Sequence, residues 1–242
     1  MPKPTKYDAW FDTGKGRFAL DQERRLLDAM LAGWPRRGRK MLDVGCGTGI
    51  FMEMLWHTGF DVTGVDRSPV VIKSARERFG SHAMQLHVAN GECLPFENGE
   101  FDYVVLWSVL EFSADPEAVL AEAGRVAERG VLIGFLNKHS LYHVTHGMHF
   151  PWAPRGRLRE ARWFSAGELG VLCQRLLGER PSVSKSVLPG PLSTWRSSFP
   201  WNHLNGYNLP LVYGAFGAVR VDFVNEKPLT PIVAWSREPE PS

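Results

Sequence analysis

The alternation of strand and helix patterns between residues 41 and 136 constrains the fold more than any other feature of the sequence. Short apolar or alternating segments indicate strands, and helical patterns lie between most of them. The expected strands are residues 41–44, 61–65, 84–89, 101–107 and 131–136. Strands that alternate with helices form a parallel sheet with helices on both faces, so we predict an α/β fold.

Capping residues mark where the helices are expected to begin. Two of them, Ser68 and Asp115, precede a proline at the first helical position, where its missing N–H costs nothing. Ser165 and Glu168 have the spacing of a capping box. The pattern at residues 21–32 predicts a further helix, with Asp21 as its N-cap.

Chain length and net charge indicate the domain size and exclude a general electrostatic attraction to polyanions. A chain of 242 residues that is 44% hydrophobic can bury a substantial core as one large domain. With 28 Lys and Arg against 26 Asp and Glu, the net charge of +2 gives no general attraction to nucleic acid or anionic lipid.

The cysteines and the apolar segments indicate in which cellular compartment the protein is expected. Three cysteines, an odd number, argue against a disulfide framework or a four-thiolate zinc site. The longest apolar stretch, residues 104–110, is far shorter than the roughly 18 residues of a membrane span. The first residues lack the apolar core of a signal peptide. We therefore expect a cytoplasmic protein that does not enter a membrane.

A glycine-rich turn follows the first expected strand. Gly45, Gly47 and Gly49 permit a tight turn and the close approach of a ligand to the backbone. The helix that follows presents free N–H groups and a partial positive charge. An ordinary strand-to-helix turn could look the same. However, Asp66 ends the next strand, where an acidic residue accepts hydrogen bonds from ribose hydroxyls in nucleotide-binding folds.

The spacing of the glycines argues against a dinucleotide-dependent oxidoreductase. The dinucleotide fingerprint is GxGxxG, and position 50 here is Ile. Asp43 also lies just before the glycines, where its carboxylate would repel a pyrophosphate but suit an ammonium group. The expected ligand is a nucleoside with an amino-acid-like tail and no phosphate.

Several ordered motifs resemble the class I S-adenosylmethionine-dependent methyltransferases. The segment Leu42-Asp-Val-Gly-Cys-Gly-Thr-Gly49 resembles their first motif, and Asp66 matches their ribose-binding acid. Asn90-Gly-Glu-Cys-Leu-Pro-Phe96 resembles the segment that frames the adenine, and residues 101–112 resemble the fourth-strand motif. The resemblance covers about residues 7–136, and the rest of the chain only in topology.

The resemblance implies S-adenosylmethionine as the cofactor and S-adenosylhomocysteine as its product. The residues that it assigns to the cofactor are Tyr7, Asp43, Gly45, Cys46, Gly47, Asp66, Arg67, Asn90, Gly91, Glu92, Trp107 and Ser108. It also implies a Rossmann-like, seven-stranded, mostly parallel sheet that ends in an antiparallel hairpin. Residues 183–187 and 215–224 have the pattern expected of that hairpin.

The expected organisation is a single methyltransferase domain over residues 1–242. Residues 1–36 would form an N-terminal cap and helix, and residues 40–136 the cofactor-binding core. Residues 137–164 and 188–210 break the alternation and look like insertions that border the substrate pocket. Five of the nine tryptophans lie in the cap and the insertions, and we expect their rings to wall the acceptor pocket. They are Trp10, Trp152, Trp163, Trp195 and Trp201.

No single residue is marked as a general base. Glu111 stands where relatives often carry His, and His139, His143, His146 and His149 crowd the first insertion. The spacing of the first three histidines would place them on one helical face. A metal site is not expected there, because no Cys or adjacent carboxylate completes a ligand set and Gly147 disturbs the helix.

A small-molecule acceptor is the expected substrate. An RNA or protein methyltransferase is one alternative, and a non-catalytic S-adenosylmethionine-binding regulatory protein is another. Arg155, Arg157, Arg159 and Arg162 could bind an anion or RNA phosphate, but a solvated face is the simpler interpretation. We do not expect nucleic acid to be a partner.

Overall fold

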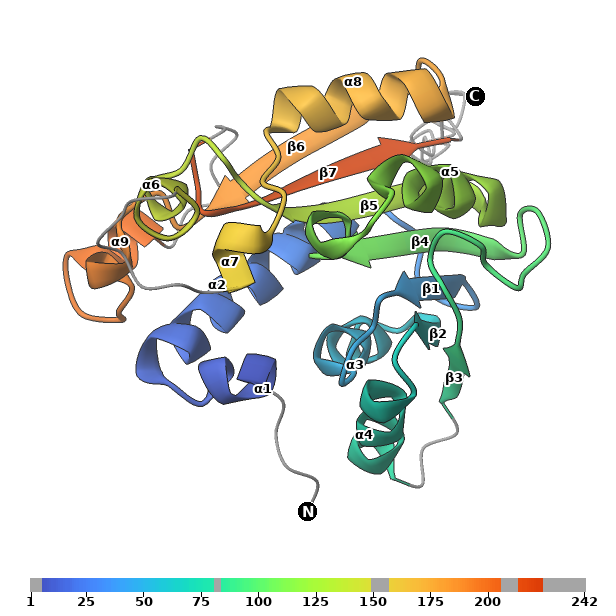
Figure 1. The fold of residues 1–242 in the computed structure, drawn as a ribbon, viewed down its shortest axis with the longest axis horizontal. Coiled ribbons are helices and arrows are strands. Elements are labelled where there is room, and N and C mark those ends of the chain that lie inside the picture. Colours follow the sequence, from blue (N-terminus) through green and yellow to red (C-terminus); the bar gives the residue numbers. More distant parts are fainter. Residues whose placement is uncertain (1–5, 81–83, 149–156, 206–212, 224–242) are drawn as a thin grey trace, which may run out of the picture.

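The computed structural model describes residues 6–80, 84–148, 157–205 and 213–223, and within them the chain forms a seven-stranded sheet (Figure 1). The strand order is β3-β2-β1-β4-β5-β7-β6. The strands are β1 (Lys40–Val44), β2 (Asp61–Asp66), β3 (Gln85–Val88), β4 (Phe101–Trp107), β5 (Ala127–Leu136), β6 (Ser182–Val187) and β7 (Phe216–Asp222). Only the pairings of β7 with β5 and β6 are antiparallel among these strands. The predicted sheet and hairpin are confirmed.

Helices cover both faces of the sheet. The helices are α1 (Lys6–Phe11), α2 (Gly14–Leu31), α3 (Ile50–His57), α4 (Pro69–Phe79), α5 (Pro116–Val126), α6 (Leu141–His146), α7 (Arg157–Glu160), α8 (Ala166–Leu177) and α9 (Trp201–Asn205), and two short 3₁₀ turns are η1 (Leu110–Phe112) and η2 (Leu192–Thr194). Helices α2, α3 and α4 share one apolar core with the sheet, and α5 and α8 share another on the opposite face (Figure 1).

The register of the parallel strands brings three functional segments to one edge. Val44 at the end of β1 pairs with Val65 on β2 and with Leu106 on β4. The glycine turn, Asp66 and Trp107 follow these positions directly. They therefore emerge side by side at the carboxyl ends of neighbouring strands, which is where open α/β sheets bind ligands.

Two elements begin earlier than the sequence predicts. Helix α2 starts at Gly14, because the hydroxyl of Thr13 accepts a hydrogen bond from the backbone N of Gly16 at 3.0 Å. Asp21 therefore lies inside the helix, exposed, and is not its N-cap. Strand β5 starts at Ala127 and not at Val131, because Ala127 pairs with β4 and Gly130 pairs with both β4 and β7.

Other predicted caps are present. The carboxylate of Asp115 accepts hydrogen bonds from the backbone N of Glu117 and Ala118, at 3.0 and 3.1 Å. Ser165 and Glu168 form both hydrogen bonds of the capping box that opens α8. Ser68 precedes α4 as predicted, but its side chain makes no capping hydrogen bond.

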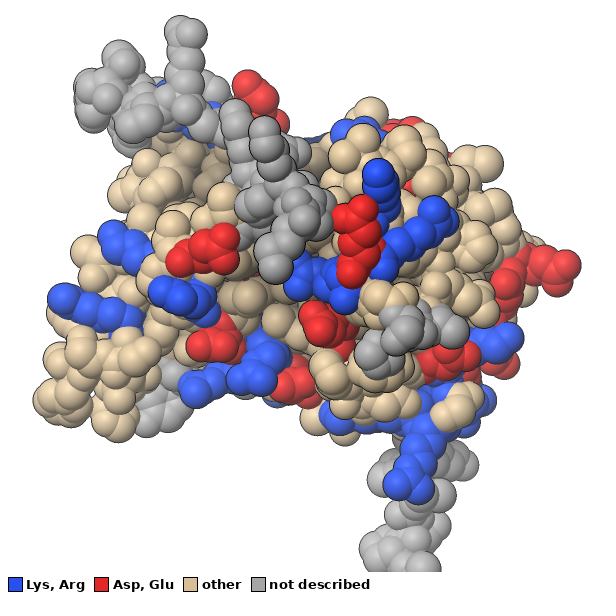
Figure 2. Space-filling view, turned by 90° about the horizontal axis from the view of Figure 1, so that it is seen from below, with Lys and Arg blue, Asp and Glu red and all other residues tan. Residues whose placement is uncertain are grey.

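The surface charge and the helices of the described residues indicate whether nucleic acid or a membrane could be a partner. Figure 2 shows Lys and Arg side chains interspersed with Asp and Glu on the face seen from below. That face has no continuous surface of one sign. Within the described ranges, none of the helices has the length and apolar character needed to span a membrane.

The cap of α2 can be tested by two substitutions in the same helix. Thr13→Ala removes the capping hydroxyl, and we expect it to lower the free energy of unfolding by about 1 kcal/mol. Asp21→Ala, the control, should change it by less than about 0.5 kcal/mol because Asp21 is exposed within the helix. Chemical denaturation measures both. A larger loss for Asp21→Ala would contradict the observed start of the helix.

Candidate functional site

The glycine turn between β1 and α3 is held in a conformation that favours glycine. Gly45, Gly47 and Gly49 have φ angles of 71°, 55° and 85°, in the left-handed region. The backbone N of Gly45 donates to the carbonyl of Val65 at 2.6 Å, which ties the turn to β2. A Cβ atom on Gly45 would lie 2.7 Å from Val109 Cγ2. The turn therefore needs glycine at position 45 for both its torsion and its space.

Asp66, at the end of β2, hydrogen-bonds two backbone segments. Its Oδ2 accepts from the N of Gly47 at 3.1 Å, and its Oδ1 accepts from the N of Ser68 at 2.8 Å. The carboxylate thus fixes the glycine turn against the start of α4. A carboxylate offers about four lone-pair positions, so hydroxyl groups of a ligand can still bind it.

Asp43 lies on β1 beneath the turn and is not among the residues that line the cavity described below. Its side chain is 2% exposed, and Oδ2 has no hydrogen-bond partner among the described residues. Burial, with a further contribution from the charge of Asp66, raises the pKa of Asp43 to about 8. An unpaired buried carboxyl group is costly, and a ligand cation would offset that cost.

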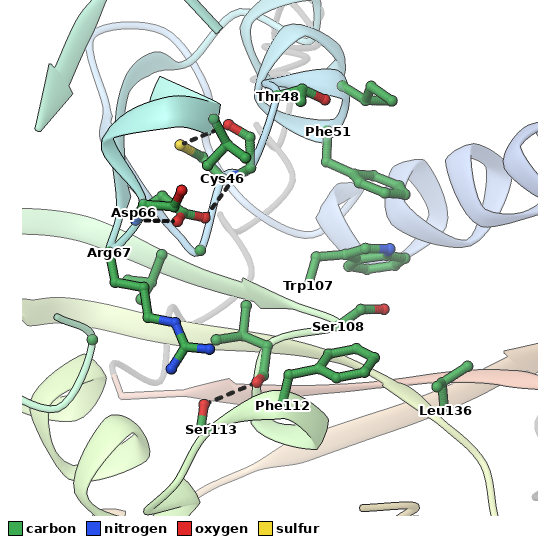
Figure 3. Close-up of a pocket in the computed structure, with 18 of the residues that line it drawn as sticks. Cys46, Thr48, Phe51, Asp66, Arg67, Trp107, Ser108, Phe112, Ser113 and Leu136 are labelled. Carbon is green, nitrogen blue, oxygen red and sulfur yellow. Dashed lines mark hydrogen bonds between the residues drawn. The ribbon is translucent and has the colours of Figure 1, made fainter. Parts of the chain in front are cut away.

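A cavity of about 720 Å³ opens at the carboxyl ends of β1, β2 and β4 (Figure 3). Ten of the residues predicted to contact a cofactor line it, and they are Gly45, Cys46, Gly47, Asp66, Arg67, Asn90, Gly91, Glu92, Trp107 and Ser108. Tyr7 lies on α1, but its side chain is outside the described residues. In Figure 3, Cys46, Asp66 and Arg67 lie on one side of the cavity, with the rings of Phe51 and Trp107 on the other.

The segment after β3 is held by a small hydrogen-bond network. Asn90 Nδ2 donates to Glu92 Oε2 at 3.2 Å, and the backbone N of Glu92 donates to Asn90 Oδ1 at 3.3 Å. Glu92 Oε1 in turn accepts from the backbone N of Asp115, at the start of α5. These contacts hold Gly91 at the cavity wall, where its lack of a side chain leaves room for a flat ligand.

The end of β4 carries the residues that join the two halves of the cavity. Ser108 has a φ of 54°, unusual for a residue other than glycine, and its backbone N donates to Gly134 O at 2.9 Å. The preceding Trp107 is 6% exposed, and its ring lies 5.4 Å from that of Phe51. Trp107 Nε1 donates to Glu23 Oε2 at 3.0 Å.

The half of the cavity away from Asp66 is apolar and aromatic. It receives side chains from α1, α2, η1, β5, α6, α7, η2 and β7. They include Trp10, Phe11, Phe112, Leu136, Tyr142, Leu158, Leu192 and Phe216. Tyr142 and Leu158 come from the segment 137–164, and Leu192 from the segment 188–210.

The predicted wall of tryptophans is mostly wrong. Trp10 lines the cavity, but Trp163, Trp195 and Trp201 do not, and Trp152 lies outside the described residues. Trp195 is buried because its Nε1 donates to Gly190 O and its ring packs on that of Tyr142. Trp163 similarly packs against Tyr142. These rings lie behind the wall and hold Tyr142 in place.

The first insertion does not place its histidines on one helical face. Helix α6 begins at Leu141 with Ser140 as its N-cap, so His139 precedes the helix and is exposed. His143 packs on the ring of Trp163. His146 lines the cavity, with its ring 4.4 Å from that of Tyr142, and burial lowers its pKa. His149 lies outside the described residues, and the described ones form no metal-binding cluster.

Glu111, the other candidate base, does not line the cavity. Its side chain is 3% exposed, and its Oε1 accepts from the backbone N of Leu136 at 2.6 Å. Burial raises its pKa to about 7, although the backbone hydrogen bonds oppose that shift. The carboxyl group joins η1 to the end of β5, which is a structural role.

Of the four arginines between residues 155 and 162, the structure describes the side chains of two, Arg159 and Arg162. Arg155 and the side chain of Arg157 are outside the described residues. The guanidinium carbon of Arg162 lies 5.2 Å from the ring centroid of Phe164. Neither Arg159 nor Arg162 lines the cavity.

Glu23 is the functional candidate that the sequence analysis missed. It lies on α2, is 2% exposed and lines the cavity. The signal was present in the sequence, because Glu23 is spaced with Ala19, Leu26 and Met30 on the buried face of a helix. An acidic residue within an apolar helical stripe indicates a buried carboxyl group that has a specific partner.

Comparisons with known proteins agree with this site. The family model described as a methyltransferase domain matches residues 42–135. An uncharacterized protein of Methanocaldococcus jannaschii is 33% identical over 138 residues, which are 56% of this chain and 60% of that protein. A ubiquinone biosynthesis O-methyltransferase of Thiobacillus denitrificans is 33% identical over 149 residues, 58% of this chain and 64% of that enzyme. This chain thus spans less than two thirds of their length.

The fold is shared with solved structures. One is a Thermotoga maritima protein described as an S-adenosylmethionine-dependent methyltransferase and possible histamine N-methyltransferase. It superposes with a TM-score of 0.69 and 22% identity, over 90% of this chain and 94% of that one. Residues 42–135, which the family model matches, contain the glycine turn, Asp66, strand β2 and most of strand β1. Residues 42–135 of this chain thus match a methyltransferase domain, and the described part of the chain shares its fold with an S-adenosylmethionine-dependent methyltransferase.

Proposed function

We propose that the protein transfers a methyl group from S-adenosylmethionine to a small-molecule acceptor with an apolar body. One observation carries this proposal. A single cavity joins the glycine turn and Asp66, at one end, to an aromatic and apolar chamber at the other. Such a cavity can hold a nucleoside-type methyl donor and an acceptor in contact with each other.

The residues at the polar end fit the cofactor. The unpaired buried carboxyl of Asp43 suits the ammonium group of the methionine tail, directly or through water. Gly45 and Gly47 leave backbone beside it with no side chain in the way. Asp66 is placed to accept from the ribose, and Asn90 and Gly91 to border the adenine, as Arg67 does from the other side. When bound, the cofactor supplies a methyl group on a positively charged sulfur.

The chain's own contribution to the reaction is placement and exclusion of water. Holding two reactants in line can be worth about 7–11 kcal/mol of the barrier. Trp107 and Ser108 lie between the polar end and the apolar chamber, so the reacting atoms would meet beside them. Tyr142, Leu158 and Leu192 wall the chamber against water.

The apolar chamber favours a small acceptor over RNA. RNA binding depends on basic residues that neutralise phosphates, yet Arg67 is the one Lys or Arg among the described lining residues. The mixed charges of the face in Figure 2 offer no continuous basic track. The relative from Thiobacillus denitrificans is named for a reaction of ubiquinone biosynthesis, which supports a small-molecule acceptor here.

Calorimetry tests the cofactor, and a labelled-methyl assay tests transfer. We expect S-adenosylmethionine and S-adenosylhomocysteine to bind with one site per chain and NAD not to bind, because the glycine turn lacks the spacing of the dinucleotide fingerprint. Labelled methyl should then appear in a small-metabolite pool and not in RNA or protein pools. Binding of NAD alone would overturn the cofactor assignment, and label in RNA or protein would overturn the acceptor class.

Asp66 gives a residue-level test of the cofactor site. Asp66→Ala removes a charge-assisted acceptor worth about 1.5–3 kcal/mol, so affinity for S-adenosylhomocysteine should fall about 10- to 150-fold. Asp61→Ala is the matched control, because Asp61 lies exposed at the other end of the same strand. Calorimetry measures the affinity of both variants for S-adenosylhomocysteine, after a thermal melt has verified that they fold. If Asp66→Ala binds S-adenosylhomocysteine as tightly as the wild-type protein, Asp66 does not bind the cofactor.

Gly45 tests the backbone geometry of the turn. Gly45→Ala places a Cβ 2.7 Å from Val109 in a left-handed conformation, so the turn must shift and cofactor affinity should fall at least about tenfold. Gly38→Ala carries the same torsional strain, with a φ of 66°, but meets no atom within 4 Å. It should lower thermal stability without affecting binding. If both variants bind the cofactor normally, the turn does not contact it.

A further inference from the structure

A buried carboxyl group faces the apolar chamber of the cavity. Glu23 projects from α2, is 2% exposed and lines the cavity together with Trp107 and Tyr142. Asp66 and Glu92, the other acidic lining residues described, are bound to backbone N–H groups at the polar end. Glu23 is therefore the acid available to an acceptor.

The hydrogen bonds of Glu23 leave one of its oxygens open. Trp107 Nε1 donates to Oε2 at 3.0 Å and so fixes the plane of the carboxyl group. Among the described residues, this is the one hydrogen bond found for the side chain, and Oε1 remains available at the cavity. A buried carboxyl group with an open oxygen has a strong need for a donor or a cation.

The described groups around Glu23 include no positive partner for its carboxyl group. Burial raises its pKa to about 8, the hydrogen bond from Trp107 opposes this, and the charge of Glu111 adds to it. The charge of Glu23 in turn contributes to raising the pKa of Tyr142. The one described Lys or Arg of the lining, Arg67, lies at the polar end, away from Leu136 in Figure 3. Because no Lys or Arg of the described lining lies beside Oε1, a ligand is the expected source of a cation there.

The aromatic rings beside Glu23 also favour a ligand that carries an ammonium group on an apolar body. The ring of Trp107 faces that of Phe51, and Tyr142 packs its ring against His146. The faces of such rings attract ammonium groups, most strongly when water is excluded. Phe112 and Leu136 extend the chamber with apolar surface for the rest of the molecule.

We propose that Glu23 binds the amino group of the acceptor, and that the acceptor is an amine with an aromatic or aliphatic body. This inference rests on the proposed function. The amine binds as an ammonium ion, whose charge stabilises Glu23 as a carboxylate, and the carboxylate then takes one proton from the nitrogen. The nitrogen lone pair then forms the new bond to the methyl carbon as the bond from carbon to sulfur breaks. The electron pair of that bond remains on sulfur, and the positive charge moves to nitrogen.

Matched pairs of ligands test this assignment on the protein loaded with S-adenosylhomocysteine. The amines are benzylamine, 2-phenylethylamine and tryptamine, and their partners are benzyl alcohol, 2-phenylethanol and tryptophol. By calorimetry, we expect at least one amine to bind about tenfold or more tightly than its alcohol, as for a charged hydrogen bond. This comparison needs no variant. If none of the amines binds, or the alcohols bind equally well, the proposal is wrong.

Glu23→Gln then assigns the effect to the carboxylate, because the amide keeps the shape and can still accept from Trp107. The affinity of the preferred amine should fall about tenfold or more, while the alcohol and S-adenosylhomocysteine bind as before. Transfer of labelled methyl to that amine should fall about 100-fold, the usual contribution of a proton acceptor. Asp28→Asn is the control: Asp28 is an exposed acid on the same helix that does not line the cavity, so its substitution should leave both measurements unchanged.

Two outcomes separate this inference from the proposed function. If Glu23→Gln weakens S-adenosylmethionine but not S-adenosylhomocysteine, the carboxylate serves the positive sulfur and not the acceptor, which overturns the proposal alone. If wild-type protein binds neither cofactor form, the proposed function itself fails. Unchanged amine binding in Glu23→Gln would also remove Glu23 from acceptor recognition.

Discussion

The carboxylate of Asp66 holds together the part of the structure on which the site depends. It accepts one hydrogen bond from the glycine turn after β1 and another from the start of α4. The parallel register of β1, β2 and β4 brings those segments to one edge, and the carboxylate then fixes their relative position. Without this link, the turn would keep its backbone hydrogen bonds to Val65 and the hydrogen bond from Arg78 to Thr48, but it would lose its connection to the start of α4.

The two halves of the cavity differ in how they are built. The polar end is formed by residues close to strand ends, and backbone hydrogen bonds determine its geometry. The apolar chamber is assembled from α1, α2, η1 and the end of β5, and from segments that lie after β5 in the chain. This division matches the proposed reaction, in which the strand ends would bind the cofactor and the surrounding segments would bind the acceptor.

Buried carboxyl groups recur around the cavity with different roles. Asp43 is unpaired beneath the turn, Glu111 joins η1 to β5, and Glu23 opens to the chamber. Burial raises the pKa of all three, so the shift alone does not identify a functional acid. What separates them is contact with the cavity and the number of protein donors that each has.

The sequence by itself determined the sheet, its hairpin, the starts of α3, α4, α5 and α8, and the polar end of the cavity. These features depend on local patterns: apolar periodicity, caps such as Asp115, and glycines at fixed distances from a strand. Only the tertiary structure decided the acceptor chamber. Glu23 and Trp107 are 84 residues apart and meet only when α2 packs on the sheet. Trp195 likewise reaches Tyr142 only in the folded chain. The start of α2 was missed because Thr13 and Asp21 are equally good caps locally, and the tertiary contacts of the first turns choose between them.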